Sequence, residues 1–212
     1  MIFSVVFTAC VLVAPVELPD KTMFATLVLA SRFRPLPVLT GVGAAFALQT
    51  AIAVAAGSLV SLLPRQWVAI GVAMLFAGGA VVLWRSAGDA SVAGGARDGW
   101  GAGEGGGSTQ DEHKTWPAWR IALASFGITF LAEWGDLSQL ATAGLAARYD
   151  APLSVFVGAL AALLLIAALA VFVGSKLITR LPLRLVRRTA AVLFAAFAVL
   201  AAYEAVSAFV AT

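Results

Sequence analysis

Charged residues are scarce in this chain, and their scarcity excludes an ordinary soluble domain. Only 12% of the 212 residues are charged, whereas a soluble domain carries roughly 25%. Hydrophobic residues make up 61% of the chain instead. The composition therefore fits a lipid bilayer as the solvent, and a helix needs about 20 mostly apolar residues to cross it.

Cysteine and histidine are almost absent, and this excludes the metal sites that depend on them. The single cysteine, Cys10, cannot form an internal disulfide or a thiolate cluster. The single histidine, His113, lies beside Asp111 and Glu112 in a polar segment, where a solvated charge cluster is favoured over a metal-sensing role. Nothing in the composition therefore favours zinc or copper.

Long apolar runs are plentiful and predict an all-α, polytopic membrane protein with six transmembrane helices. The first run has no basic residue ahead of it, which is not typical of a signal peptide. The expected spans are residues 2–30, 38–63, 66–85, 119–147, 152–176 and 183–210.

A Gly-rich polar segment separates these spans into two groups of three. Between Ser86 and Trp116 the chain contains almost no large aliphatic residue. Such a segment cannot bury enough apolar surface to order itself, so it is expected to be a flexible linker. The predicted organisation is a first repeat at 1–86, a linker at 87–117 and a second repeat at 118–212.

The two halves carry nearly the same phrase. Leu131–Ala143 reads LAEWGDLSQLATA, and Val16–Leu27 reads VELPDKTMFATL, with the acidic residues 116 positions apart. Because each half contains an odd number of spans, the second half must enter the membrane from the opposite face. This predicts inverted repeats, an arrangement that places the substrate site of many secondary transporters near the bilayer midplane.

The distribution of Lys and Arg predicts the orientation, and it explains the net charge of +3 without a nucleic-acid partner. Eleven basic residues fall on the side of the linker and two on the other side, with Lys21 left inside a span. Positive residues stay cytoplasmic. The linker is therefore expected in the cytoplasm and both termini outside, in a plasma or inner membrane.

Four acidic residues lie inside the apolar runs: Glu17, Asp20, Glu133 and Asp136. Within each pair the spacing of three residues places both side chains on one helix face. An acid at the centre of a transmembrane helix costs about 2.5–3.5 kcal/mol, so a countercharge, protons or a cation must compensate. Lys21 is the expected countercharge.

Brought together, these acids predict an oxygen-rich site for a hard divalent cation such as Ca²⁺, Mg²⁺ or Mn²⁺. Crowding and burial both favour protonated carboxyl groups in the empty site, so cation and protons compete for the same oxygens. Trp134, inside the second motif, is expected to line or gate the cavity. Further oxygen ligands are expected from Thr22, Ser138, Gln139 and Gln49, and for Gln49 a contact between helices is the open alternative.

The phrases ELPDKT and EWGDLS resemble the paired motifs of the transmembrane protein 165 family, also called uncharacterised protein family 0016 or the Gdt-one-like family. The resemblance covers nearly the whole chain outside the linker. It implies a six-span exchanger of Mn²⁺ or Ca²⁺ against protons, within the lysine-exporter superfamily, with the four acids as cation ligands. The metal is then transported substrate rather than cofactor, and bacterial relatives are implied to remove Mn²⁺ from the cytoplasm.

Two residues depart from the family pattern. Pro19 replaces the motif glycine in the first half, and Leu137 replaces a basic residue in the second. The first change alters how the helix breaks. The second leaves the ionised site with formal charge −3 rather than −2, which favours tighter cation binding or more protons in the empty site.

Other functions explain the sequence less well than cation exchange. Export of an amino acid needs a group that binds a carboxylate, and only Lys21 is available inside the spans. An intramembrane acid-dyad enzyme leaves two of the four acids unexplained. A structural subunit leaves the repeated motif unexplained. The sequence indicates a transporter rather than an enzyme, and it leaves the oligomeric state open.

Overall fold

The computed structural model describes residues 2–17, 26, 29–30, 33–88, 116–173 and 183–210. These residues form seven helices, so the all-helical prediction is confirmed for them. Helices suit an apolar solvent because their backbone groups are satisfied within the segment. The helices are α1 (Phe3–Glu17), α3 (Pro35–Val60), α4 (Arg65–Gly88), α6 (Ala118–Ala132), α7 (Leu137–Arg148), α8 (Pro152–Val173) and α10 (Leu183–Val210).

Four of these helices are long and apolar enough to cross a membrane: Pro35–Val60, Gln66–Arg85, Pro152–Phe172 and Arg188–Ser207. They match four of the six predicted spans. The span predicted at 119–147 is not one continuous helix, because α6 and α7 are separate and meet at residues 133–136. The span predicted at 2–30 is described up to Glu17 and only in part beyond it.

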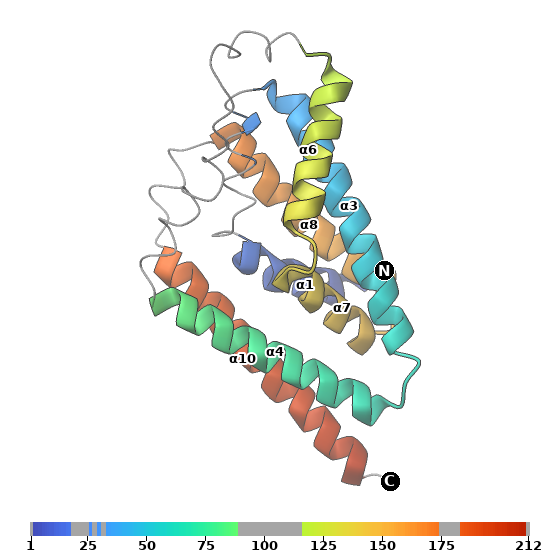
Figure 1. Ribbon diagram of the computed structural model, residues 1–212. Coiled ribbons are helices and arrows are strands. Elements are labelled where there is room, and N and C mark those ends of the chain that lie inside the picture. The colour runs from blue at the N-terminus through green and yellow to red at the C-terminus, as the bar shows by residue number, and fades with distance from the viewer. Residues whose placement is uncertain are drawn as a thin grey trace.

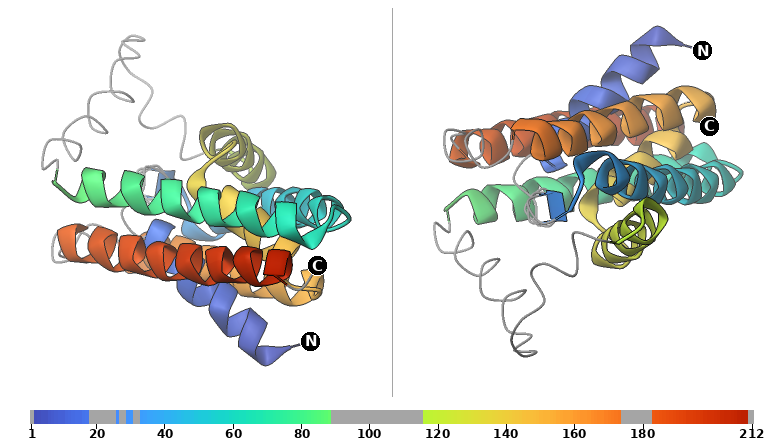
Figure 2. Two further views of the ribbon diagram at one scale, coloured as in Figure 1. Left: turned by 90° about the horizontal axis from the view of Figure 1, so that it is seen from below. Right: turned by 90° about the horizontal axis from the view of Figure 1, so that it is seen from above.

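Helices α4 and α10 form a long antiparallel pair along one side of the molecule (Figures 1 and 2). Aromatic residues hold the pair together, with the rings of Phe76 and Phe194 edge to face at 5.1 Å and Phe197 at 5.6 Å from Phe76. Phe76 and Phe194 are completely buried. The remaining helices pack together on the other side of the molecule (Figure 1).

Several close crossings join helices from different halves of the chain. A Cβ atom at Gly41 of α3 would meet the carbonyl oxygen of Ala122 on α6, and it would lie 2.9 Å from the Cβ of Ser125. A Cβ atom at Gly158 of α8 would meet the carbonyl oxygen of Val6 on α1. Small residues allow such close approach of helix backbones. Helices α3 and α8 are thereby fixed against α6 and α1.

Candidate cation site

Helix α6 ends inside the protein. It has 15 residues, and Glu133 caps its C-terminus. A helix of this length is about 22 Å long, which is shorter than the hydrocarbon core of about 30 Å. Glu17 is the last described residue of α1. The two helices therefore bring one glutamate each to the middle of an apolar bundle.

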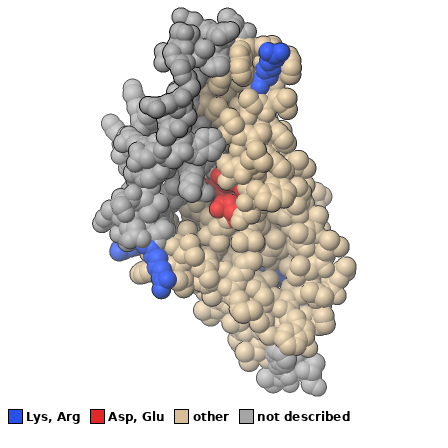
Figure 3. Space-filling model, in the orientation of Figure 1, with Lys and Arg blue, Asp and Glu red and all other residues tan. Residues whose placement is uncertain are grey.

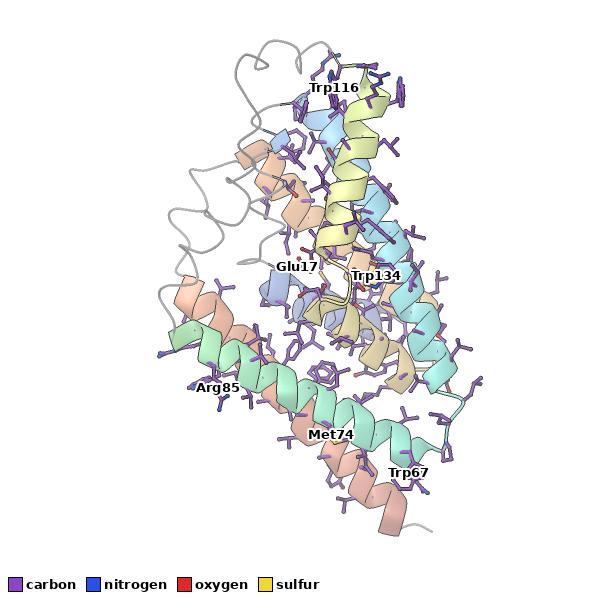
Figure 4. All side chains as sticks on the ribbon, in the orientation of Figure 1. Glu17, Trp67, Met74, Arg85, Trp116 and Trp134 are labelled. Atoms are coloured by element: carbon purple, nitrogen blue, oxygen red, sulfur yellow. The ribbon has the colours of Figure 1, made fainter. Side chains whose placement is uncertain are left out.

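Carboxylates from both halves of the chain meet at this point. One oxygen each from Glu17, Glu133 and Asp136 lies within 4.8 Å of the other two. Glu17 is 2% exposed and Glu133 is 3% exposed. Figure 3 shows acidic side chains near the middle of an otherwise largely uncharged face, and Figure 4 shows Glu17 close to the junction of α6 and α7. The predicted convergence of the halves is thus observed for three of the four acids.

The break between α6 and α7 positions two of these acids. Gly135 has φ +78°, a left-handed conformation that residues with a Cβ rarely adopt. Asp136 follows in an extended conformation and caps α7, its carboxylate accepting a hydrogen bond from the Ser138 N–H at 3.4 Å. Glu133 and Asp136 therefore converge through a tight turn, and the predicted i, i+3 helical geometry is wrong for this pair.

Two glutamine side chains satisfy backbone groups that the break leaves without helical partners. Gln49 of α3 donates from Nε2 to the carbonyl oxygen of Phe130 at 3.0 Å. Gln139 donates to the carbonyl oxygen of Glu133 at 2.8 Å and accepts from the Gly135 N–H at 3.2 Å. For Gln49, a contact between helices is the alternative that the sequence leaves beside cation ligation, and its bond from α3 to α6 is such a contact. For Gln139 the sequence predicts ligation alone, and its bracing role depends on a helix end that no sequence pattern specifies.

The other predicted site residues take different positions. Ser138 is buried at the start of α7, and its carbonyl oxygen accepts a hydrogen bond from the Thr142 hydroxyl at 2.7 Å. Trp134 is 61% exposed and packs on Phe130 with ring centroids 5.0 Å apart. Figure 4 shows Trp134 and Glu17 near the same helix break. Predicted residues that lie outside the described ranges are Asp20, Lys21, Thr22, Pro19 and His113.

Two hydroxyl groups on α6 were missed by the sequence analysis. Ser125 and Thr129 are 0% and 1% exposed. They precede Glu133 by eight and four residues, so all three share one helix face. The recurrence of polar residues at this spacing inside an apolar run was the available signal.

Comparison with known proteins shows the family of this chain. The family model described as divalent cation/proton antiporter GDT1 matches residues 5–91 and 121–209, which include both acidic motifs. The chain belongs to the GDT1 family. The resemblance seen in the sequence motifs is thereby confirmed.

Individual members of the GDT1 family match the chain over most of its length. A GDT1-like protein of Synechocystis is 34% identical over 91% of this chain and 94% of its own length. A protein of Vibrio cholerae named "Putative manganese exporter" is 30% identical over 95% of this chain and 92% of its own. GDT1-like protein 5 of Arabidopsis thaliana is 31% identical over 86% and 88%. No solved structure matches the chain.

Membership in the GDT1 family decides between the functions left open by the sequence. The protein is a transporter that exchanges divalent cations for protons, and it is not an enzyme. Its cation is therefore a transported substrate. The four long apolar helices agree with a multi-pass membrane protein.

Proposed function

We propose that this protein exports Mn²⁺ from the cytoplasm in exchange for protons. In this proposal Glu17, Glu133 and Asp136 bind the cation, and Asp20 completes the set. The observation that carries the proposal is the meeting of three carboxylates, from two halves of the chain, within 4.8 Å. Two of them are almost completely buried, where an uncompensated charge is costly.

The spacing of the carboxylates suits a single hard cation. Oxygens on opposite sides of a Ca²⁺ ion lie about 4.6–5.2 Å apart, which is twice the usual bond length of 2.3–2.6 Å. Oxygens around the smaller Mg²⁺ ion are closer, at bond lengths of about 2.0–2.1 Å. A set of oxygens within 4.8 Å therefore needs little or no movement to surround one divalent ion.

Exchange follows from competition for these oxygens. Without a cation, mutual repulsion and burial favour carboxyl groups that keep protons. A divalent cation supplies the positive charge that the protons supplied, so its arrival releases them. The ion and the protons then cross the membrane in opposite directions at one site, which couples the two fluxes.

Neighbouring residues support the site in this proposal. Gln49 and Gln139 hold the broken backbone in place through their hydrogen bonds, which keeps Glu133 and Asp136 aimed at the cluster. The same two glutamines, with Thr22 and Ser138, supply further oxygen atoms when a cation binds. Lys21 provides a countercharge, and Trp134 gates access to the site.

We also propose that the fold consists of two inverted three-span repeats, 1–86 and 118–212, joined by a linker at 87–117. Three pairs of features support the proposal. Glu17 of α1 and Glu133 at the end of α6 are both buried. The crossing of Gly41 with α6 has its counterpart in the crossing of Gly158 with α1. The long helices α4 and α10 pair with each other.

The proposed orientation places the linker in the cytoplasm and both termini outside, in the cell membrane. Basic residues of the described chain support it, since Arg34, Arg85, Arg120 and Arg188 lie at the helix ends nearest the linker side. Labelled tryptophans mark both ends of the bundle, Trp67 at one and Trp116 at the other (Figure 4). Tryptophan is enriched at both interfaces of a membrane.

Mn²⁺ is the proposed physiological cation because a relative that covers nearly the whole chain is named a manganese exporter. Ca²⁺ fits the same oxygens and remains the second substrate of the proposal. Cells that lack their own manganese exporter provide the test. Expression of the wild-type chain should restore Mn²⁺ tolerance and lower intracellular Mn²⁺, whereas Glu133→Gln should do neither. Equal tolerance with both proteins would contradict the proposal.

A further inference from the structure

The buried hydroxyl groups of Ser125 and Thr129 differ from several other hydroxyls on the helices. Thr142, Thr40 and Thr189 each donate to a backbone carbonyl oxygen three or four residues earlier, at 2.7–2.9 Å. This is the usual arrangement of a hydroxyl inside a helix. Ser125 Oγ and Thr129 Oγ1 have no such partner among the described residues.

Burial without a partner needs an explanation. A buried hydroxyl without a hydrogen bond costs about 1–3 kcal/mol. Ordered water usually satisfies such groups in protein interiors. Two hydroxyls of this kind, one helical turn apart and leading to a carboxylate, indicate that water molecules bind between them.

Packing alone does not require these hydroxyls. Ser125 lies where α6 crosses Gly41 of α3, and the matching crossing of Gly158 with α1 places Ala9 at the equivalent position. The next residue toward the glutamate is Thr129 on α6 but Val13 on α1, and Val13 is also completely buried. The two crossings have the same close geometry, and only the α6 crossing is polar.

The spacing of the polar groups fits a chain of single water molecules. Residues four apart on a helix are separated by about 6 Å along its axis. Two O–H···O hydrogen bonds of about 2.8 Å span nearly the same distance. One water can therefore bridge Ser125 to Thr129, and a second can bridge Thr129 to Glu133.

We propose that Ser125 and Thr129 form the inner part of a proton path. The path leads from the carboxylate cluster along α6 toward the end of the bundle where α6 begins. The inference rests on the proposed exchange at that cluster. A proton moves along the chain as each water or hydroxyl accepts one proton and donates another, so no group changes its net protonation. The close approach at Gly41 leaves no room beside Ser125 for a hydrated divalent cation. Protons and cations therefore reach the cluster by different routes.

The path is present in one half of the protein only. The α1 face that leads to Glu17 carries Ala9 and Val13, which can neither donate nor accept a proton. The two halves therefore carry matching acidic residues, but the helix faces that lead to these acids carry different side chains. This difference gives protons one preferred route to a site that both halves build.

The experiment compares Thr129→Val, Thr129→Ser and Ser125→Ala with the wild type. Valine keeps the shape of threonine and removes its hydroxyl, whereas serine keeps the hydroxyl. Purified proteins are reconstituted into vesicles with an internal pH dye, and the initial rate of Mn²⁺-driven proton flux is measured. Calorimetry in detergent gives the Mn²⁺ affinity of each protein. Ser154→Ala is the control, since Ser154 is also buried but lies at the Ile2 end of α8.

We expect Thr129→Val and Ser125→Ala to slow proton flux about tenfold, as the loss of one bridging hydrogen bond implies. Mn²⁺ affinity should stay within about twofold of the wild type, and Thr129→Ser and Ser154→Ala should transport normally. Wild-type flux in both hydroxyl-free variants would overturn the inference. Proton flux slowed equally by Thr129→Ser would also overturn it, because the residue would then act through packing. Weaker Mn²⁺ binding by Thr129→Val would overturn it as well, because Thr129 would then be a cation ligand. A wild-type protein without Mn²⁺-coupled proton flux would refute the proposed function itself.

Discussion

A carboxylate oxygen of Glu17 at the end of α1 lies within 4.8 Å of one from Glu133 at the end of α6, although the residues are 116 positions apart. Both side chains are buried. Each half of the chain therefore contributes to one acidic cluster, and neither half can form it alone.

Loss of either glutamate should abolish exchange to a similar extent. Glu17→Gln and Glu133→Gln each remove one negative charge and one cation ligand from the same cluster. We expect each to lower the initial rate of Mn²⁺ transport in reconstituted vesicles by roughly 100-fold. Replacing a residue that only hydrogen-bonds to a metal ligand already lowers metal affinity or activity about 10–100-fold. A large difference in transport rate between the two variants would contradict a site built by both halves.

Glu204→Gln is the matched control for these substitutions. Glu204 pairs with Arg148 at 2.7 Å and is 50% exposed, beside a cavity of about 690 Å³ at the far end of α7. The Arg148 side chain is only 12% exposed, and glutamine keeps an oxygen that can accept its hydrogen bond. Glu204→Gln should leave the transport rate within about twofold of the wild type, and a large loss would place a second essential acid outside the cluster.

Gly135→Ala should disturb the site through the backbone. A Cβ at this residue would meet nothing within 4 Å, so steric contact is not the cause. The strain comes from φ +78° and costs roughly 1–2 kcal/mol. We expect a lower temperature of thermal unfolding in detergent and weaker Mn²⁺ binding by calorimetry.

Gly127→Ala provides the comparison for that variant. Gly127 lies inside α6, and its Cβ position is equally open. Alanine is favoured over glycine in a helix interior by about 1 kcal/mol. Gly127→Ala should therefore raise the unfolding temperature or leave it unchanged. Similar destabilisation by both substitutions would show that the conformation of Gly135 is not what matters.

Gln139→Leu should loosen the break between α6 and α7. The substitution removes two hydrogen bonds to the backbone of Glu133 and Gly135, at a cost of about 1–2 kcal/mol. We expect Mn²⁺ affinity to fall roughly tenfold, as it does when residues that orient metal ligands are replaced. Gln66→Leu, at the start of α4 and remote from the break, should bind Mn²⁺ normally. Unchanged affinity in Gln139→Leu would refute the bracing role.

Gly41→Ala and Gly158→Ala should destabilise the protein to a similar degree. Each added methyl group would press on a backbone carbonyl across a helix crossing, and overpacking of this kind costs about 1–3 kcal/mol. Thermal unfolding in detergent measures the effect. Gly78→Ala, with nothing within 4 Å of its Cβ, is the control. A clear effect at only one of the two crossings would contradict their proposed equivalence.

The sequence predicted the features that its repeated motifs and apolar runs specify. The repeated acids and the long apolar helices follow from residue type and spacing, which is why the meeting of Glu17 with Glu133 could be expected. The geometry of the second motif could not. Residues 119–147 are apolar enough to suggest one helix, but the left-handed Gly135 and the hydrogen bonds of Gln49 and Gln139 depend on contacts between helices.

The most direct test of the shared cluster is the position of the bound ion. Crystals of the protein grown with Mn²⁺ and measured near the manganese absorption edge would locate the ion by its anomalous scattering. The account predicts one strong peak within bonding distance of carboxylate oxygens from both Glu17 and Glu133. A peak bonded to acids of only one half, or one located beside Arg148 and Glu204, would contradict it.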